Sequence, residues 1–264
     1  MSRTKWYVAA AALVVMALAV AGCQKEQTAT QEAQMAAPAA PKATPIDPAT
    51  VGSVSGTVKF EGTPPKAVRI DMSQDPACKA TATGPATSEV VVADKGNLAN
   101  VFVYVKEGLG DRTFDVPKEK VTIDQHGCRY HPHVMGVMAG QTVEILNSDD
   151  TTHNIHPTPA AASGNREWNE SQAPKAAPLE KTFAREELML PVKCNQHPWM
   201  KMYVNVVKHP FFAVSGADGT FEIKGLPPGE YTIAAVHEKL GEQTTKVTIG
   251  PKEAKTAEFS FKGQ

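Results

Sequence analysis

The residues of this sequence best suited to chemistry stand in one short segment, Cys194-Asn-Gln-His197-Pro-Trp-Met200-Lys-Met202. Cys194 and His197 are separated by two residues on a predicted loop between apolar strands, a spacing at which a thiolate and an imidazole can share one metal ion. Met200 and Met202 add two thioethers. Because soft sulfur donors combined with imidazole suit copper, the segment predicts a copper-binding loop.

A second segment supplies the histidine that such a site still needs. It reads Thr-Thr-His153-Asn-Ile-His and follows a predicted strand that ends at Asn147. A blue-copper centre requires two imidazoles and a thiolate in a trigonal arrangement, with a weak and long axial methionine. We therefore expect His153 to join Cys194 and His197 at one metal site.

Together the two segments resemble the cupredoxin family, and within it the amicyanins most closely. The resemblance covers about residues 119–208 and implies a Greek-key sandwich with one type 1 copper ion per chain. By position it implies three copper ligands, His153, Cys194 and His197. The short ligand loop of amicyanins places the axial methionine three residues after the histidine, which selects Met200. The longer spacing of plastocyanins selects Met202 as the alternative axial ligand.

Neighbouring residues have supporting roles in this interpretation. Asn154 is expected to tie the first histidine's strand to the cysteine loop by hydrogen bonds, the alternative being an ordinary turn residue. His156 is expected to point away from copper, because side chains alternate along an extended strand. Pro191 and the long loop 157–178, in which Trp168 is expected to be a packing anchor, depart from the pattern of small cupredoxins.

The N-terminal residues have the pattern of an export signal. Arg3 and Lys5 precede an apolar run over residues 6–21, which is shorter than the about 20 residues that a membrane span needs. The run ends in Val-Ala-Gly-Cys23, which resembles a bacterial lipobox and implies cleavage before Cys23 and lipidation of its sulfur. An ordinary signal peptide followed by a chance cysteine is the alternative.

This pattern divides the N-terminal part of the chain. Residues 1–22 are predicted to be a lipoprotein signal peptide. Residues 23–50, rich in Ala, Gln, Thr and Pro, are predicted to be a flexible tether. By resemblance to the sorting pattern of enteric bacteria, Gln24 implies anchoring to the outer membrane, on the periplasmic face of the cell envelope.

The chain has four cysteines, Cys23, Cys78, Cys128 and Cys194. In an oxidising compartment a free thiol needs a specific use. With Cys23 assigned to lipidation and Cys194 to copper, Cys78 and Cys128 remain as a predicted disulfide, and the alternative is that both stay reduced. On the chain-entropy account, closing a loop of about 50 residues stabilises a fold by about 4 kcal/mol.

Three histidines surround Cys128, and they are His126, His131 and His133. They could form a second metal site, but their spacing matches no zinc motif. We interpret this segment as a sheet edge close to the copper domain, held in place by the disulfide.

Composition and strand signals indicate an all-β fold. The chain has 264 residues, is 42% hydrophobic and 21% charged, and carries a formal net charge of −1. It lacks the basic excess that a nucleic-acid partner requires. After about residue 50, short β-branched segments alternate with Gly, Pro, Asn and Asp turns, and no helical period persists outside the signal peptide.

Both ends of the folded part resemble a carboxypeptidase regulatory-like module, which is a transthyretin-type sandwich. The C-terminal motif is Gly216-Ala-Asp-Gly-Thr-Phe-Glu-Ile, followed by Gly225-Leu-Pro-Pro-Gly-Glu-Tyr-Thr-Ile. The usual opening motif of the module corresponds to Ser55-Gly-Thr-Val and Gly62-Thr-Pro-Pro, near the other end of the chain.

This second resemblance implies one sandwich made of two parts. Residues 51–118 and 209–264 would form it together, with the cupredoxin domain, residues 119–208, inserted in it or packed beside it. Modules of this type are non-catalytic. His237 and Glu238 are interpreted as an exposed pair at a strand end, because no nucleophile or second ligand accompanies them.

The expected function is one-electron transfer by a copper-binding lipoprotein. His197, with Pro198 and Trp199, would form an apolar edge for a redox partner such as a c-type cytochrome or a periplasmic oxidoreductase. The alternatives are a copper-handling lipoprotein that stores, delivers or senses Cu(I), and an interaction scaffold without metal. No second copper for substrate turnover is visible in the sequence, so we do not predict an enzyme.

Overall fold

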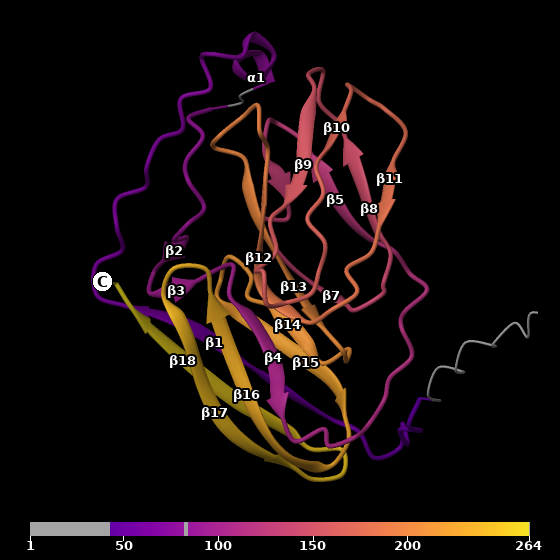
Figure 1. The fold of residues 1–264 in the computed structure, drawn as a ribbon. Helices are drawn as coiled ribbons and strands as arrows, with labels where there is room; N and C mark the ends of the chain where they lie inside the picture. Colours follow the sequence, from indigo (N-terminus) through magenta and orange to yellow (C-terminus); the bar gives the residue numbers. More distant parts are fainter. Residues whose placement is uncertain (1–42, 82–83, 264) are drawn as a thin grey trace, which may run out of the picture. The chain divides into compact units, whose positions relative to one another are not determined.

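The computed structural model describes residues 43–81 and 84–263 (Figure 1). Within these ranges the protein is all-β, as the sequence predicts, with one short helix among the strands. The predicted signal peptide, the lipidation site Cys23 and the tether up to residue 42 lie outside the described residues. In the part that is described, no helix has the length and apolar character that crossing a bilayer requires.

The strands form four sheets. The first contains β1 (Gly52–Glu61), β2 (Ala93–Asp94), β3 (Asn97–Leu98), β15 (Thr220–Leu226) and β18 (Ala254–Lys262). The second contains β4 (Phe102–Glu107), β14 (Phe212–Val214), β16 (Gly229–His237) and β17 (Gly241–Ile249). The third contains β7 (Val134–Met138), β9 (His153–Pro157), β10 (Glu170–Gln172), β12 (Glu187–Lys193) and β13 (Lys201–Val207). The fourth contains β5 (Val121–Gln125), β6 (Tyr130–His131), β8 (Val143–Asn147) and β11 (Leu179–Lys181).

The first two sheets join segments from both ends of the described chain. β1 pairs with β15 in antiparallel and with β18 in parallel orientation, while β4 lies between β14 and β16. Along β18, Ala257, Phe259 and Phe261 are buried and alternate with exposed residues, as expected of a strand with one face on a core. Strands from the two predicted parts of the sandwich therefore pair with each other. The exact domain boundaries at 118/119 and 208/209 stay a prediction.

The third and fourth sheets enclose a second core, which we call the loop core because it includes residues of the Cys194–Met200 loop. It contains Ile123, Ile145, Ile155 and Val204. The β12–β13 hairpin and β9 belong to the same sheet, with Lys193 of β12 opposite His156 of β9. This pairing brings the ends of the two sequence segments with metal-ligand character to one place.

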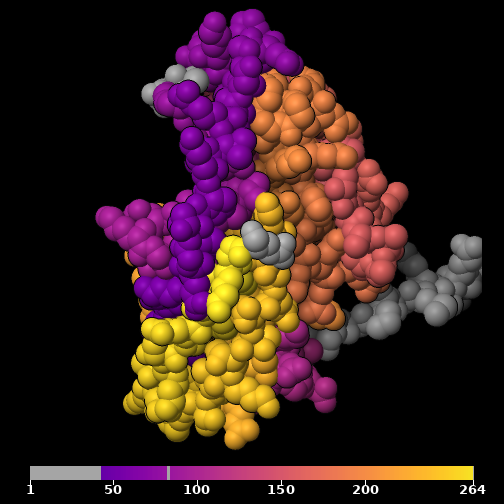
Figure 2. Space-filling view, turned by 90° about the vertical axis from the view of Figure 1, so that its left-hand side faces the viewer, coloured from indigo at the N-terminus to yellow at the C-terminus, as the bar shows by residue number. Residues whose placement is uncertain are grey.

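A segment of the first predicted sandwich part packs on the loop core. Residues 68–81 and 84–88, which we call the strap, are joined by an Arg69–Thr87 bridge and a hydrogen bond from the Ile70 N–H to the Ala86 carbonyl. The helix α1 (Pro76–Thr81) lies within the strap. Figure 2 shows indigo atoms of this part of the chain against orange atoms of residues near 200. The strap thus approaches the Cys194–Met200 loop from outside the predicted cupredoxin domain.

The short helix α1 does not conflict with the absence of a sustained helical period outside the signal peptide. Six residues are too few for a hydrophobic period to be visible. The local signal was Asp75 followed by Pro76, because an Asp at the N-cap and a Pro at the first helical position favour a helix start. The Asp75 carboxylate accepts hydrogen bonds from the N–H groups of Ala77 and Cys78 at 2.8 and 3.0 Å.

The interpretation of His237 and Glu238 as an exposed pair was wrong. His237 is 2% exposed and the Glu238 side chain 6% exposed. The end of β16 packs where the sheets meet, and Glu238 accepts a hydrogen bond from Nε2 of His133 at 2.5 Å. The contact that buries the pair comes from residues more than a hundred positions away, which strand-end position in the sequence does not show.

Candidate metal centre

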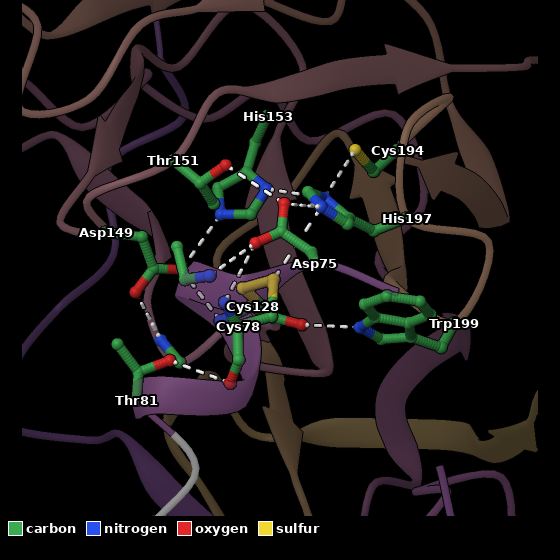
Figure 3. Close-up of a disulfide and its surroundings, with 12 residues drawn as sticks. Asp75, Cys78, Thr81, Cys128, Asp149, Thr151, His153, Cys194, His197 and Trp199 are labelled. Carbon is green, nitrogen blue, oxygen red and sulfur yellow. Dashed lines mark hydrogen bonds and ion pairs between the residues drawn. A yellow bond between two sulfur atoms is a disulfide. The ribbon is translucent and has the colours of Figure 1, made fainter. Parts of the chain in front are cut away.

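Three side chains converge in the loop core. His153, Cys194 and His197 are all buried, and one ligand atom from each lies within 4.8 Å of the others. Nδ1 of His153 is 2.9 Å from Nδ1 of His197, and the Cys194 sulfur is 3.6 Å from the same His197 nitrogen. Figure 3 shows the two imidazoles and the thiol facing one another. The structure therefore brings together the three ligands that the sequence predicts.

The loop between β12 and β13 is held closed by its backbone. The Cys194 N–H donates to the Met200 carbonyl at 3.2 Å, and the Met200 N–H donates to the His197 carbonyl at 2.9 Å. These bonds continue the strand register, in which Lys193 is paired with Lys201. Cys194 and His197 are thus placed by a short, tightly bonded hairpin loop rather than by a free connection.

A carboxylate orients each imidazole by contacting its Nε2 atom, which lies on the side of the ring away from the other imidazole. Nε2 of His153 lies 2.9 Å from Oδ2 of Asp149, and Nε2 of His197 lies 3.1 Å from Oδ2 of Asp75. Because a carboxylate accepts, each Nε2 carries the proton, and in the neutral rings each Nδ1 presents a lone pair. Two lone pairs that face each other at 2.9 Å require a cation between them, which a proton or a metal ion can supply. The arrangement fits a metal centre.

Asp149 is itself anchored by backbone donors. Its two carboxylate oxygens accept from the N–H groups of Gly127 and Cys128, both at 2.7 Å. Gly127 and Cys128 have positive φ values of 61° and 55°, a conformation that turns successive N–H groups toward one anion. Burial raises the pKa of Asp149, but the bonds from His153, Cys128 and Gly127 outweigh it and lower the pKa below its usual value.

Asp75 has a similar position on the other side of the centre. Its second oxygen also accepts the Thr151 hydroxyl at 3.2 Å. The N–H of Cys78, with smaller contributions from His197 and Thr151, lowers the pKa of Asp75 to about 2. Asp75 is therefore a carboxylate that connects the strap to the His197 ring.

The predicted disulfide is confirmed. Cys78 of α1 is bonded to Cys128, with the two Cα atoms 5.5 Å apart, and both residues are fully buried. Figure 3 shows the disulfide beside the carboxylate–imidazole pairs. The Cys78 sulfur is 3.6 Å from Nε2 of His197, and the Cys128 carbonyl accepts the indole N–H of Trp199 at 3.1 Å. Both ends of the disulfide thus touch residues of the centre.

The electrostatics of the centre favour a thiolate beside an imidazolium. Burial raises the pKa of Cys194, but its hydrogen bond with His153 and those from three backbone N–H groups bring that pKa to about 6. Burial lowers the pKa of His153, yet Asp149 and the Cys194 sulfur raise it overall to about 9. A thiolate is the form of cysteine that binds metal, so the surroundings prepare Cys194 as a ligand.

The two methionines are distinguished by register. Met202 is paired with Val192, two residues before the cysteine, whereas the backbone bond between Cys194 and Met200 places these two opposite each other. Opposite residues of an antiparallel pair, and residues two apart on one strand, direct their side chains to the same face. Both methionines therefore share the face of Cys194, and Met200 is the one directly opposite it. Both methionines are buried. The register favours Met200 as the axial ligand, and the choice between the two stays a prediction.

Asn154 ties the two segments together through its backbone. Its N–H lies 3.2 Å from the Cys194 sulfur, while its side chain donates to Asn169 of the long loop. His156 points elsewhere, with Nδ1 at 2.8 Å from Asn195 and Nε2 at 2.7 Å from Glu167. The expected link between strand and loop therefore exists, but the Asn154 side chain does not make it.

The histidines around Cys128 separate into two environments. His126 and His131 are exposed, and Nε2 of His131 is 3.1 Å from the His126 carbonyl. His133 is buried against Glu238. Among the described residues, none of the three belongs to a group of side chains close enough to share a metal ion.

The expected docking edge was wrong in one respect. His197 is only 3% exposed, because the strap covers its outer nitrogen with Asp75 and Cys78. Trp199 is partly exposed, and its ring centroid is 5.1 Å from that of His197. The surface next to the centre is therefore formed by Pro198 and Trp199, without the His197 ring.

Sequence reasoning missed the two carboxylates. Asp75 lies 122 positions before His197, so no local spacing connects them. Asp149 is four residues before His153, and the turn Asn-Ser-Asp-Asp after a strand was the only local signal. Each carboxylate is recognisable as part of the centre only once the strap and the Gly127–Cys128 turn are in place.

No family model matches the chain, and no curated protein matches it. Similar solved structures include a copper-containing nitrite reductase from Thermus scotoductus SA-01, with 21% identity over 38% of this chain and 25% of that one, at a TM-score of 0.31. A purple cupredoxin from Nitrosopumilus maritimus has 21% identity over 33% of this chain and 99% of that one, at a TM-score of 0.28. Amicyanin from Paracoccus versutus (Thiobacillus versutus) has 20% identity over 40% of this chain and 97% of that one, at a TM-score of 0.30. At such TM-scores the assignment of the centre depends on its side chains.

Proposed function

We propose that this protein binds one copper ion in a type 1 centre formed by His153, Cys194 and His197, with Met200 as the weak fourth ligand. The observation that carries the proposal is the convergence of two imidazole Nδ1 atoms and one thiol, with each Nε2 held by a carboxylate. This donor set, two nitrogens and one thiolate beside a thioether, is the one that blue-copper electron-transfer sites use.

The residues of the chain give this centre its rigidity. Asp149 and Asp75 hold the imidazole tautomers, and the bonded hairpin loop holds Cys194. The Asn154 N–H donates to the cysteine sulfur and so stabilises its negative charge. A bound copper ion would supply one-electron exchange between Cu(I) and Cu(II). Ligands that stay in place in both oxidation states keep the rearrangement on electron transfer small.

The function that this centre supports best is that of a one-electron carrier rather than an enzyme. We propose that a redox partner, such as a c-type cytochrome or a periplasmic oxidoreductase, docks over Pro198 and Trp199. The partly exposed Trp199 ring supports this location, because it contacts the buried His197 ring and would connect it to the surface.

The proposed location is the bacterial cell envelope. The lipobox-like sequence that ends at Cys23 supports export and lipid anchoring, and Gln24 supports the outer membrane. The Cys78–Cys128 disulfide is in keeping with an oxidising compartment.

The test is a visible spectrum of the full chain after addition of Cu(II). We expect an intense thiolate-to-copper band in the wild type, no such band in Cys194→Ser, and an unchanged band in the control His156→Gln. His156 is on the same strand as His153 but turns away from the centre. A band that survives in Cys194→Ser would refute the type 1 assignment. A colourless Cu(I) protein that exchanges its metal rapidly would indicate copper handling instead of electron transfer.

A further inference from the structure

The Cys78–Cys128 disulfide links the two carboxylates that orient the copper-type histidines. On one side, the Cys78 N–H donates to Asp75, which holds His197. On the other side, the Cys128 N–H donates to Asp149, which holds His153. One covalent bond therefore joins the two supports of the centre, as Figure 3 shows.

On the Cys78 side of this linkage, helix α1 itself is shallowly buried, whereas the strap on either side of it packs on the loop core through Met72, Ile70 and Ala86. Within α1, Cys78 is the single buried residue, and Pro76, Lys79 and Ala80 are exposed. Besides the disulfide, the Asp75 carboxylate connects this part of the strap to Thr151 and His197. Segments with few buried apolar contacts open locally at low free-energy cost. Opening of α1 would expose a disulfide that is otherwise inaccessible.

We propose that the Cys78–Cys128 disulfide is a thiol–disulfide exchange site for an external dithiol, and that its reduction loosens the copper centre and speeds copper release. The proposal rests on the proposed copper function. It adds to that function a modification site with a defined class of reactant, a dithiol small molecule or a dithiol protein.

The exchange balances without any further reactant. A thiolate of the dithiol attacks the Cys78 sulfur, the bond to Cys128 breaks, and a mixed disulfide forms. The second thiol of the reactant then attacks this mixed disulfide and closes its own disulfide. Two electrons and two protons pass to the protein, leaving Cys78 and Cys128 as thiols and the reactant oxidised.

Reduction changes the surroundings of both histidines. The strap is no longer covalently held, so Asp75 can leave His197 and uncover the imidazole that it now buries. The new thiols would also stand beside the ligands, because Cys78 groups with Asp75 and His197, and Cys128 with Asp149 and His153, as possible metal donors. Soft thiols that compete for Cu(I) give the metal a route out of the centre.

The experiment measures Cu(I) release from the full chain before and after disulfide reduction. Metal-free protein is divided, and one half is treated anaerobically with dithiothreitol and desalted. Both halves are then loaded with Cu(I), with ascorbate as a reductant that leaves disulfides intact. Transfer of Cu(I) to bathocuproine disulfonate is then followed by absorbance, and free thiols are counted. We expect the thiol count to rise by two and the release rate to rise about tenfold or more, in line with the usual effect of losing supports around metal ligands.

The Cys78→Ser/Cys128→Ser double variant is the second arm. This variant should release copper rapidly with or without dithiothreitol. If the variant does not fold, the reduced wild type replaces it, and circular dichroism shows whether the reduced protein keeps its fold. A disulfide that resists dithiothreitol, or a rise of two thiols with an unchanged release rate, would overturn the proposal. Failure of the copper function itself would be visible earlier, as absence of a Cys194-dependent band in the oxidised protein.

Discussion

Two regions of this molecule bury histidines and treat them in opposite ways. At the candidate metal centre, burial is outweighed by Asp149 and Cys194, and the pKa of His153 is raised to about 9. In the sandwich region, burial dominates, and the pKa values of His209 and His237 are lowered to about 4. Nδ1 of His209 accepts a backbone N–H from Phe211. The same type of side chain is thus prepared for charge in one place and kept neutral in the other.

The comparison shows that burial alone does not mark a functional histidine. Nδ1 of His237 accepts the N–H groups of Lys239 and Leu240, which is a structural use of the ring. A carboxylate partner is not sufficient either, since His133 pairs with Glu238 and lies in no group of possible metal donors among the described residues. What distinguishes the centre is convergence of ligand atoms from different segments onto one point.

The largest expected effect is a loss of copper affinity that occurs on substitution of a histidine at the centre and not on substitution of a histidine in the sandwich. His153→Ala removes one of three converging ligands, and we expect copper affinity to fall by more than about a thousandfold, or ~4 kcal/mol. His237→Asn is the matched control, because Asn can accept the same backbone N–H groups in a buried position. We expect it to bind copper like the wild type in a competition titration with a chelator. Comparable losses in the two variants would mean that copper affinity reflects general stability.

The second prediction concerns the covalent link that only the copper-type region has among the described residues. The disulfide closes a loop with a sequence separation of 50 residues, so its loss in Cys78→Ser/Cys128→Ser should lower the free energy of unfolding by about 4 kcal/mol. Urea unfolding of the metal-free protein measures this change. A loss below about 1 kcal/mol would contradict the chain-entropy account of this disulfide.

The third prediction tests the sandwich histidines by pH. The folded-state pKa of His237 is about 4, below the ordinary value of 6.5, so the unfolded chain binds the proton first as the pH falls. The contribution of His237 to the free energy of unfolding is fully present above pH 6.5. It is lost as the pH falls toward 4, and the loss is about 2–3 kcal/mol.

The measurement compares the pH dependence of unfolding in wild type and His237→Asn. The variant should be less stable at pH 7, because a smaller side chain fills the buried site, but its stability should fall less between pH 6.5 and 4. Parallel curves for the two proteins would indicate that folding does not lower the pKa of His237, and the contrast between the two regions would then disappear.

Much of this contrast lies beyond what a sequence can predict. The ligands were predictable because Cys194 and His197 are close in sequence and His153 stands at the end of a clear strand. The disulfide followed from the use of the other cysteines. The buried state of His237 and the role of Asp75 were not predictable, since both depend on contacts between segments more than a hundred residues apart. Local patterns specify strands and loop ligands, whereas supports around a site depend on tertiary packing.

The smallest expected effect concerns the carboxylates themselves. Asp149→Asn removes the negative charge beside His153 and replaces one acceptor oxygen by NH₂. Depending on how the amide turns, either the Gly127 N–H loses its acceptor, or the Cys128 N–H and the His153 ring both lose theirs. We expect copper affinity to fall about 10- to 100-fold. Asp75→Asn should have a weaker effect, because the Thr151 hydroxyl can reverse its hydrogen bond to an amide.

The control for both is Asp218→Asn, an aspartate in the sandwich that accepts the Thr220 N–H and hydroxyl in an exposed turn. Copper affinity, measured by competition with a chelator, should decrease in the order Asp218→Asn, Asp75→Asn, Asp149→Asn. If Asp149→Asn and Asp218→Asn bind copper equally well, the carboxylate does not orient His153. The raised pKa of His153 would then be an electrostatic consequence of the centre, and convergence of the three ligands alone would distinguish this region from the sandwich.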